Sequence, residues 1–245
     1  MLNKITVCLA ALCVFLVSAS FASEAQPQAE EQALNARQES IVAISALTAN
    51  GNTDTLKATL NEALDAGLTV NEANEVIVHV YAYAGFPRSF NGMMTFMSVM
   101  DERQAKGIKD EMGKEASPVP ADLNRDDYGA KVRAQLSGLD EVPPPAKWQK
   151  FSPLIDTFLK EHLFADLFAR DILSFQDREL ATVAILASMT GVDGPLRYHL
   201  GAAMSVGLTE AQMKDFISVI KAKVGVKEAE QADRLLEAVL KARAK

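Results

Sequence analysis

The sequence predicts an all-α protein. Hydrophobic residues make up 49% of the 245 positions, and alanine and leucine, which favour helices, are abundant among them. Apolar residues recur at helical spacing between Leu180 and Ala187, and no stretch alternates apolar and polar residues as a half-buried strand would. The chain therefore has the composition and the periodicity of a packed helical domain.

The first residues, 1–22, have the features of a secretory signal peptide. Lys4 supplies a positive charge, an apolar run extends from Ile5 to Val17, and small residues end at Ala22. This run is shorter than the roughly 20 residues that a membrane-spanning helix needs. We therefore expect cleavage near Ala22, a periplasmic or secreted protein, and no stable membrane insertion afterwards.

Both cysteines of the chain, Cys8 and Cys13, lie in this segment. Cleavage would leave a mature protein without thiol catalysis, thiolate metal ligands or disulfides. It would also remove Lys4, so the net charge becomes one unit more negative than the −7 of the whole chain. With no basic block in the sequence, we expect no nucleic-acid partner.

The rest of the chain contains a degenerate duplication. A shift of 140 residues aligns 62–77 with 202–217 without a gap. Three glycines coincide in this alignment: Gly51 with Gly191, Gly67 with Gly207, and Gly85 with Gly225. We predict a first repeat over 34–112 and a second repeat over 150–245.

A Gly-Leu-Thr sequence occurs at the same place in both repeats. Glycine can close the preceding helix in the left-handed conformation. Thr69 and Thr209 can then cap the next helix, with Glu72 and Gln212 completing capping boxes. Ser174 marks a similar helix start, for a helix that runs to about Thr190.

A linker rich in proline and charge, 113–149, separates the repeats. Its prolines stop helices, so we expect only a short one from Tyr128 to Leu136. Trp148, the only tryptophan, is expected to seal the start of the second repeat.

Three stretches of the sequence carry a family resemblance: HLFADLFARDILSFQDRELATVAILASMTG, LRYHLGAAMSVGLTEAQM and VYAYAGFPRSFNGM. They resemble the carboxymuconolactone decarboxylase family, whose wider fold group includes the alkylhydroperoxidase-D proteins. The resemblance implies an alkylhydroperoxidase-D-like helical fold. Single units of that fold usually form trimers or hexamers, so we expect a homo-oligomer, a trimer of two-repeat chains.

The redox members of this group use a glutamate, two cysteines and a histidine. Glu179 and His199 match the glutamate and the histidine, whereas Val192 and Pro195 replace the cysteines. Thiolate attack on a peroxide needs sulfur. A peroxidase-related function is therefore disfavoured and would depend on the thiols of a partner protein.

The decarboxylase branch has a signature that resembles Tyr-x-Gly-x-Pro-x-x-x-Asn. Tyr83 to Asn91 match it in the first repeat, but the second repeat has lost it. Conversely, Thr59 stands in the first repeat where the second has His199. Each repeat keeps what the other lacks, so we predict one composite site with His199 facing the 83–91 segment.

The expected roles in this site follow from side-chain chemistry. The imidazole of His199 suits proton transfer near neutral pH, and Glu179 either orients it or forms a solvent ion pair with Arg178 or with a neighbouring helix. The remaining candidates would stabilise an oxyanion or hold a carboxylate: Tyr83, Arg88, Asn91 and Arg197, the last of which could equally be a surface charge.

Two functions from different classes remain open. The first is a cofactor-free lyase or isomerase acting on a small lactone or carboxylate. The alternative is a non-catalytic periplasmic binding or assembly protein, which predicts a site closed by apolar side chains. His79 lies in an apolar stretch and is expected to be a packed core residue, and the three scattered histidines favour no metal site.

Overall fold

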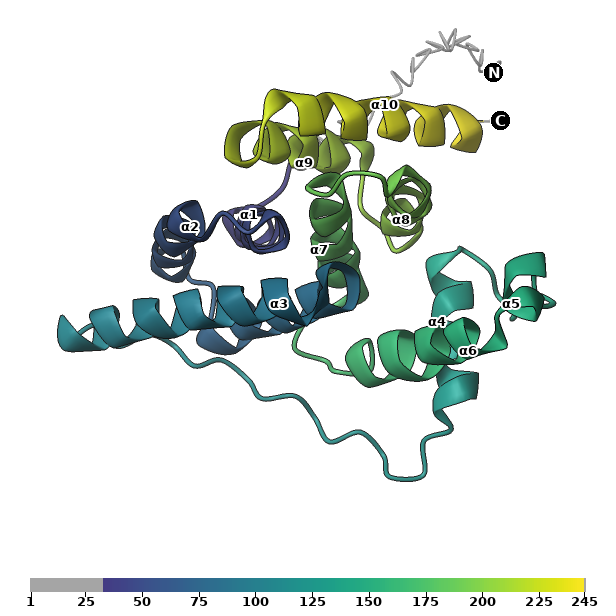
Figure 1. Cartoon of the computed structure of the whole chain (residues 1–245), viewed down its shortest axis with the longest axis horizontal. Helices are drawn as coiled ribbons and strands as arrows, with labels where there is room; N and C mark the ends of the chain where they lie inside the picture. Colours follow the sequence, from purple (N-terminus) through teal and green to yellow (C-terminus); the bar gives the residue numbers. More distant parts are fainter. Residues whose placement is uncertain (1–32, 245) are drawn as a thin grey trace, which may run out of the picture. The chain divides into compact units, whose positions relative to one another are not determined.

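The structure is a computed structural model that describes residues 33–244. The predicted signal peptide, its cleavage site near Ala22 and both cysteines lie outside the described residues. Within 33–244 the chain forms ten α-helices and one π-helix, with no β-strand (Figure 1). The all-α prediction is confirmed.

The two repeats have the same order of helices. The first repeat comprises α1 (Ala36–Asn50), α2 (Thr53–Asp65) and α3 (Val70–Ala105). The second repeat comprises α7 (Phe175–Ala187), α8 (Asp193–Ser205), α9 (Glu210–Lys223) and α10 (Val226–Arg243). Helices α2 and α8 begin and end 140 residues apart, so the duplication in the sequence is a duplication in the fold.

The shared Gly-Leu-Thr sequence forms the predicted turn in both repeats. Gly67 and Gly207 have φ angles of 93° and 101°, in the left-handed region that favours glycine. The side chains of Thr69 and Thr209 accept hydrogen bonds from the third backbone N–H of α3 and α9, and both capping boxes are complete. The same local chemistry therefore positions α3 and α9.

Helix α3 consists of two helical segments that meet at Gly85. This glycine has φ 82° and ψ 163°, and Pro87 follows it, so the helical hydrogen bonds cannot continue through this point. The Ser89 hydroxyl donates to the carbonyl of Ile77 over 2.7 Å, which shows that the second segment folds back on the first. Gly225 takes the equivalent position between α9 and α10.

The linker contains more helix than the sequence indicates. After an irregular stretch over 106–124, it forms α4 (Arg125–Leu136), which includes the predicted short helix, and then α5 (Lys147–Phe151). Beyond the linker, at the start of the predicted second repeat, helix α6 (Pro153–Thr157) continues into the π-helix η1 (Phe158–Leu167), and α4 packs along η1.

The expectation for Trp148 is wrong. Its side chain is 46% exposed, and it contacts the guanidinium of Arg133 at 5.8 Å from the ring centroid. The short helix α5 that carries it buries none of its residues. Trp148 therefore packs on α4 at the surface instead of closing the second repeat.

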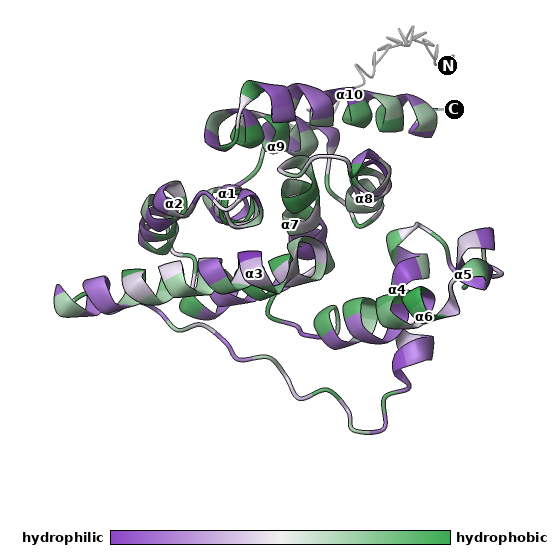
Figure 2. Cartoon of the chain, in the orientation of Figure 1, coloured by the Kyte–Doolittle hydropathy of each residue, from purple (hydrophilic) through white to green (hydrophobic). Residues whose placement is uncertain are grey.

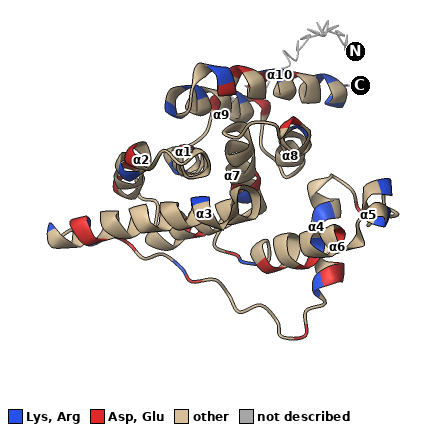
Figure 3. Cartoon of the chain, viewed as in Figure 1, with Lys and Arg blue, Asp and Glu red and all other residues tan. Residues whose placement is uncertain are grey.

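Helices α1 and α7 form the centre of the described domain. They pack against each other, and the run from Ile41 to Ala49 in α1 is buried without interruption. Both helices carry charged residues only near their N-terminal ends and are otherwise uncharged, whereas Figure 2 shows hydrophobic and hydrophilic residues mixed along α10, and Figure 3 shows charged residues along α10. One further helix of each repeat packs against the central helix of the other repeat: α3 packs on α7, and α9 packs on α1.

Arg37 links the two repeats near the start of α1. Its guanidinium donates to Asp177 of α7 at 2.8 and 3.1 Å and to Glu72 of α3 at 2.7 Å. Burial alone would raise the pKa of Asp177, but the hydrogen bonds and charge of Arg37 outweigh it and lower that pKa. Among the described helices, none has both the length and the apolar character of a membrane span.

Candidate functional site

A glutamate–histidine pair lies at the interface of α7 and α8. The side chain of Glu179 is fully buried, and His199 keeps only 6% of its surface exposed. The Nδ1 atom of His199 lies 2.8 Å from Oε2 of Glu179. A carboxylate only accepts hydrogen bonds, so this contact assigns a proton to Nδ1, and in the neutral form of the ring Nε2 has a lone pair. This arrangement is that of an oriented acid–base group.

Tyr83 of the first repeat contacts this pair. It lies in the last turn of α3 before the break at Gly85, and its ring centroid is 5.6 Å from that of His199, nearly perpendicular to it. Its hydroxyl is buried and makes no hydrogen bond. Burial and the charge of Glu179 raise the pKa of Tyr83, while the nearby Thr182 hydroxyl acts weakly in the opposite direction. The phenol therefore stays protonated and can act as a donor.

The site contains two buried polar atoms without a partner, the Tyr83 hydroxyl and Oε1 of Glu179. An unpartnered buried polar group costs about 1–3 kcal/mol of stability. Native proteins rarely keep buried polar atoms without a partner, and one explanation for such atoms is that they bind a ligand. Their position beside an oriented histidine supports a chemical role.

A second buried polar cluster adjoins the site and was not foreseen from the sequence. Arg178 of α7 is fully buried and donates to Glu75 at 2.7 Å and to the carbonyl of Arg170 at 2.7 Å. Glu75 also accepts from the side chain of Arg170. The expected solvent ion pair between Arg178 and Glu179 is therefore wrong, because both side chains are buried and bonded elsewhere. A possible sequence signal was the charged triplet 177–179 in an otherwise apolar helix.

His79 is the packed core residue that the sequence predicts, and it lies between the two clusters. Its Nε2 is 2.9 Å from the Thr182 hydroxyl, and its ring centroid is 5.4 Å from that of Tyr83. Burial first, and then the charge of Arg178, hold the pKa of His79 well below its usual range. His79 is thus a neutral group that supports Tyr83.

An apolar layer from α4 and η1 covers this region. Side chains of α4 and η1 pack against Ala202 of α8 and against Tyr83: Val132, Leu136, Phe164 and Phe168. Tyr198 lies over His199 with ring centroids 5.0 Å apart, and its hydroxyl is hydrogen-bonded to Ser137 at 2.9 Å. Tyr198 is itself 41% exposed, so its ring contacts both the imidazole and solvent.

The other three predicted residues lie apart from this cluster. Arg88, Asn91 and Arg197 are exposed, and no hydrogen bond, ion pair or ring contact among the described residues joins them to Glu179, His199 or Tyr83. Arg88 rests against the Gly51 turn, where an added Cβ would lie 1.6 Å from its Nη1. The composite site therefore contains Tyr83 from the 83–91 segment, and the arginine of that segment points elsewhere.

The part of the chain from 33 to 244 holds no group of three or more His, Cys, Asp or Glu side chains arranged to bind a metal. A model of the carboxymuconolactone decarboxylase family matches residues 19–93 and 153–238. No curated protein matches the chain. The two matched regions cover more than half of the sequence and correspond to its two repeats. The chain therefore belongs to the carboxymuconolactone decarboxylase family, as a tandem member.

Proposed function

We propose that the protein is a cofactor-free lyase or isomerase that acts on a small lactone or carboxylate. The observation that supports it best is the buried contact of 2.8 Å between Nδ1 of His199 and Oε2 of Glu179, beside the unpartnered Tyr83 hydroxyl. This set contains a base, a group that orients it and a donor for a developing oxyanion. It needs no sulfur, in agreement with Val192 and Pro195 at the two cysteine positions.

The proposed chemistry is proton transfer at a carbon next to a carbonyl. Nε2 of His199 takes the proton, the electron pair of the broken C–H bond moves onto the carbonyl oxygen, and Tyr83 donates a hydrogen bond to that oxygen. Glu179 stabilises the imidazolium that forms. Return of the proton to another carbon completes an isomerisation.

Decarboxylation would use the same groups in another order. The C–C bond to the carboxylate breaks, carbon dioxide leaves, and the electron pair again moves onto the carbonyl oxygen. The imidazolium of His199, protonated from water, then protonates the carbon. Substrate access requires the cover above His199 to move, which includes the Tyr198 side chain and the apolar layer of α4 and η1.

One observation favours a second candidate, a non-catalytic binding or assembly protein. The apolar layer of α4 and η1 covers the site, and His199 is only 6% exposed. This is the closed arrangement expected of a scaffold that has lost its activity. We also propose that the chain is exported and self-associates, with N-terminal sequencing after Ala22 as the check on export.

The test is a screen of small lactones and β-keto acids with the purified protein, followed by variants on any substrate that turns over. We expect His199→Ala to lower kcat by about 100-fold or more, as for loss of a general acid–base group. Glu179→Gln and Tyr83→Phe should each lower kcat by about tenfold or more, since each removes one charge-assisted or oxyanion contact.

His162→Ala is the matched control, because His162 is exposed and bonded only to Asp166 and to the ring of Tyr81. It should leave turnover unchanged. Full activity of folded His199→Ala would overturn the proposed role. Saturable binding without turnover of any compound would favour the non-catalytic candidate.

A further inference from the structure

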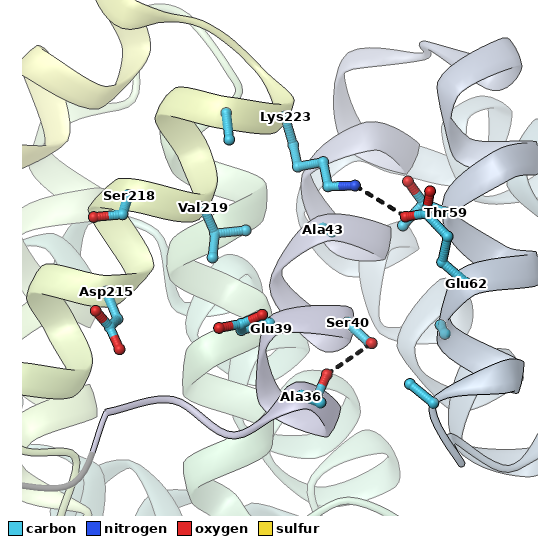
Figure 4. Close-up of a pocket in the computed structure, with 13 residues that line it drawn as sticks. Ala36, Glu39, Ser40, Ala43, Thr59, Glu62, Asp215, Ser218, Val219 and Lys223 are labelled. Atoms are coloured by element: carbon cyan, nitrogen blue, oxygen red, sulfur yellow. Dashed lines mark hydrogen bonds and ion pairs between the residues drawn. The ribbon is translucent and has the colours of Figure 1, made fainter.

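An open cavity of about 420 Å³ lies between α1, α2 and α9, away from the His199 site (Figure 4). Helices α1 and α2 belong to the first repeat, and α9 belongs to the second. Small side chains such as Ala43, Ala63 and Val219 form much of its wall. The volume is within the range of cavities that bind small molecules.

This cavity is the counterpart of the His199 site under the 140-residue shift. The residues that line it take the places of the site residues in the other repeat: Glu39 for Glu179, Thr59 for His199, Asp215 for Glu75, Val219 for His79 and Lys223 for Tyr83. The fold therefore builds the same hollow twice, with different side chains.

The two hollows differ in their cover. Beside His199, Ala202 and Val206 of the second repeat and Val78 of α3 pack under the side chains of α4 and η1. Their counterparts Glu62, Ala66 and Ser218 line the open cavity instead. One hollow is thus filled by apolar packing, and the other is accessible.

The charges of the open cavity are mainly negative. Its one lysine, Lys223, forms an ion pair with Glu62 at 3.1 Å. Within residues 33–244, neither Glu39 nor Asp215 is paired with a cationic side chain, and the one hydrogen bond that Asp215 accepts there comes from the backbone N–H of Leu34. Figure 4 shows these two carboxylates on facing helices at one end of the cavity.

A buried hydroxyl supplies an independent observation. Thr59 lines the cavity, is only 3% exposed, and its Oγ1 has no hydrogen-bond partner. Such a group gains a partner when a ligand with a polar atom enters. Thr59 stands at the position that His199 occupies in the second repeat, where the imidazole faces Glu179.

We propose that this cavity is a second binding site, for a small organic cation with a primary ammonium group and a short aliphatic body. The ammonium would donate to Glu39 and Asp215, the aliphatic part would contact the alanine and valine walls, and Thr59 would bond a polar atom of the ligand. This site is independent of the proposed catalytic function.

The test uses butylammonium as the probe, with butyrate and butan-1-ol as matched compounds, followed by NMR chemical shifts of the protein. Butylammonium should give saturable shifts in α1 and α9, and the other two should not. Glu39→Gln and Asp215→Asn should each weaken binding of butylammonium by about fivefold or more, because each removes a charged acceptor of the ammonium group.

Glu237→Gln is the charge-matched control, because it removes an exposed carboxylate of α10 outside the cavity. It should bind like the unmodified protein, and so should His199→Ala. Equal binding of butan-1-ol and butylammonium would overturn the proposal, as would unchanged affinity in folded Glu39→Gln and Asp215→Asn.

Discussion

At the scale of single residues, His79 shows how the buried network fixes a protonation state. The Thr182 hydroxyl donates to the carbonyl of Arg178, so it can only accept from Nε2 of His79. Nδ1 of His79 then faces the guanidinium of Arg178 at 3.4 Å with its lone pair. A second proton on this ring would lie beside a buried positive charge, and the ring therefore stays neutral.

This arrangement predicts a pH dependence of stability. The pKa of His79 is lowered in the folded state, so below about pH 6.5 the unfolded state binds more protons than the folded state. The stabilisation is present above that pH and is lost as the pH falls. We expect a slope of up to about 1.4 kcal/mol per pH unit between pH 6.5 and 5 in urea unfolding. His79→Gln should flatten it, and an unchanged slope would contradict the assignment.

The residue scale also shows what a sequence can reveal about a site. Glu179, His199 and Tyr83 were found by motif matching, and the fold brings all three together. Arg178 was missed because its burial depends on a partner, Glu75, more than 100 residues away in the chain. Motif spacing also gave no information on the direction of Arg88, which depends on the Gly51 turn.

At the scale of elements, the helix ends were the most predictable features. The Gly-Leu-Thr sequence determines the backbone conformation of the turn and the cap of the next helix, so the turns before α3 and α9 can be predicted from a few residues. The break in α3 did have a local signal in Gly85 and Pro87, whereas the π-helix η1 left no comparable signal. The expectation for Trp148 was wrong because its surroundings depend on packing against Arg133 of α4, which the sequence around Trp148 does not indicate.

The caps make a testable prediction for both repeats. Thr69→Ala and Thr209→Ala each remove a side-chain acceptor at a helix start, and each should lower the free energy of unfolding by about 1 kcal/mol. Thr95→Ala is the control, because its hydroxyl bonds only the carbonyl of Asn91 within α3. Chemical denaturation measures all three. A loss no larger than that of the control would contradict the capping role.

At the scale of the whole molecule, the second segment of α3 bears an apolar surface. Four side chains at helical spacing are at least half exposed there: Phe86, Phe90, Met94 and Met97. A groove of about 510 Å³ runs beside them, between Val78, Tyr81 and Phe90. Contiguous apolar surface of this kind marks interaction sites in soluble proteins.

We expect this surface to be the contact between chains in the proposed trimer. Phe90→Glu places a charge at its centre and should lower the mass measured by light scattering to that of one chain. Met112→Glu, which alters an exposed methionine outside α3, should leave the assembly intact. A monomeric unmodified protein, or an unchanged mass of Phe90→Glu, would exclude this contact.

The cavity lined by Thr59 is open, whereas the equivalent position at His199 is covered, and this difference predicts how many ligands one chain binds. Duplication by itself would give each chain two ligand positions, but the helices before α7 occupy the space above one of them. Titration with an alkylamine should therefore end at one equivalent per polypeptide. Binding of a second equivalent of the amine would mean that α4 and η1 are displaced from the site at His199. The endpoint of the titration therefore measures whether these two helices move.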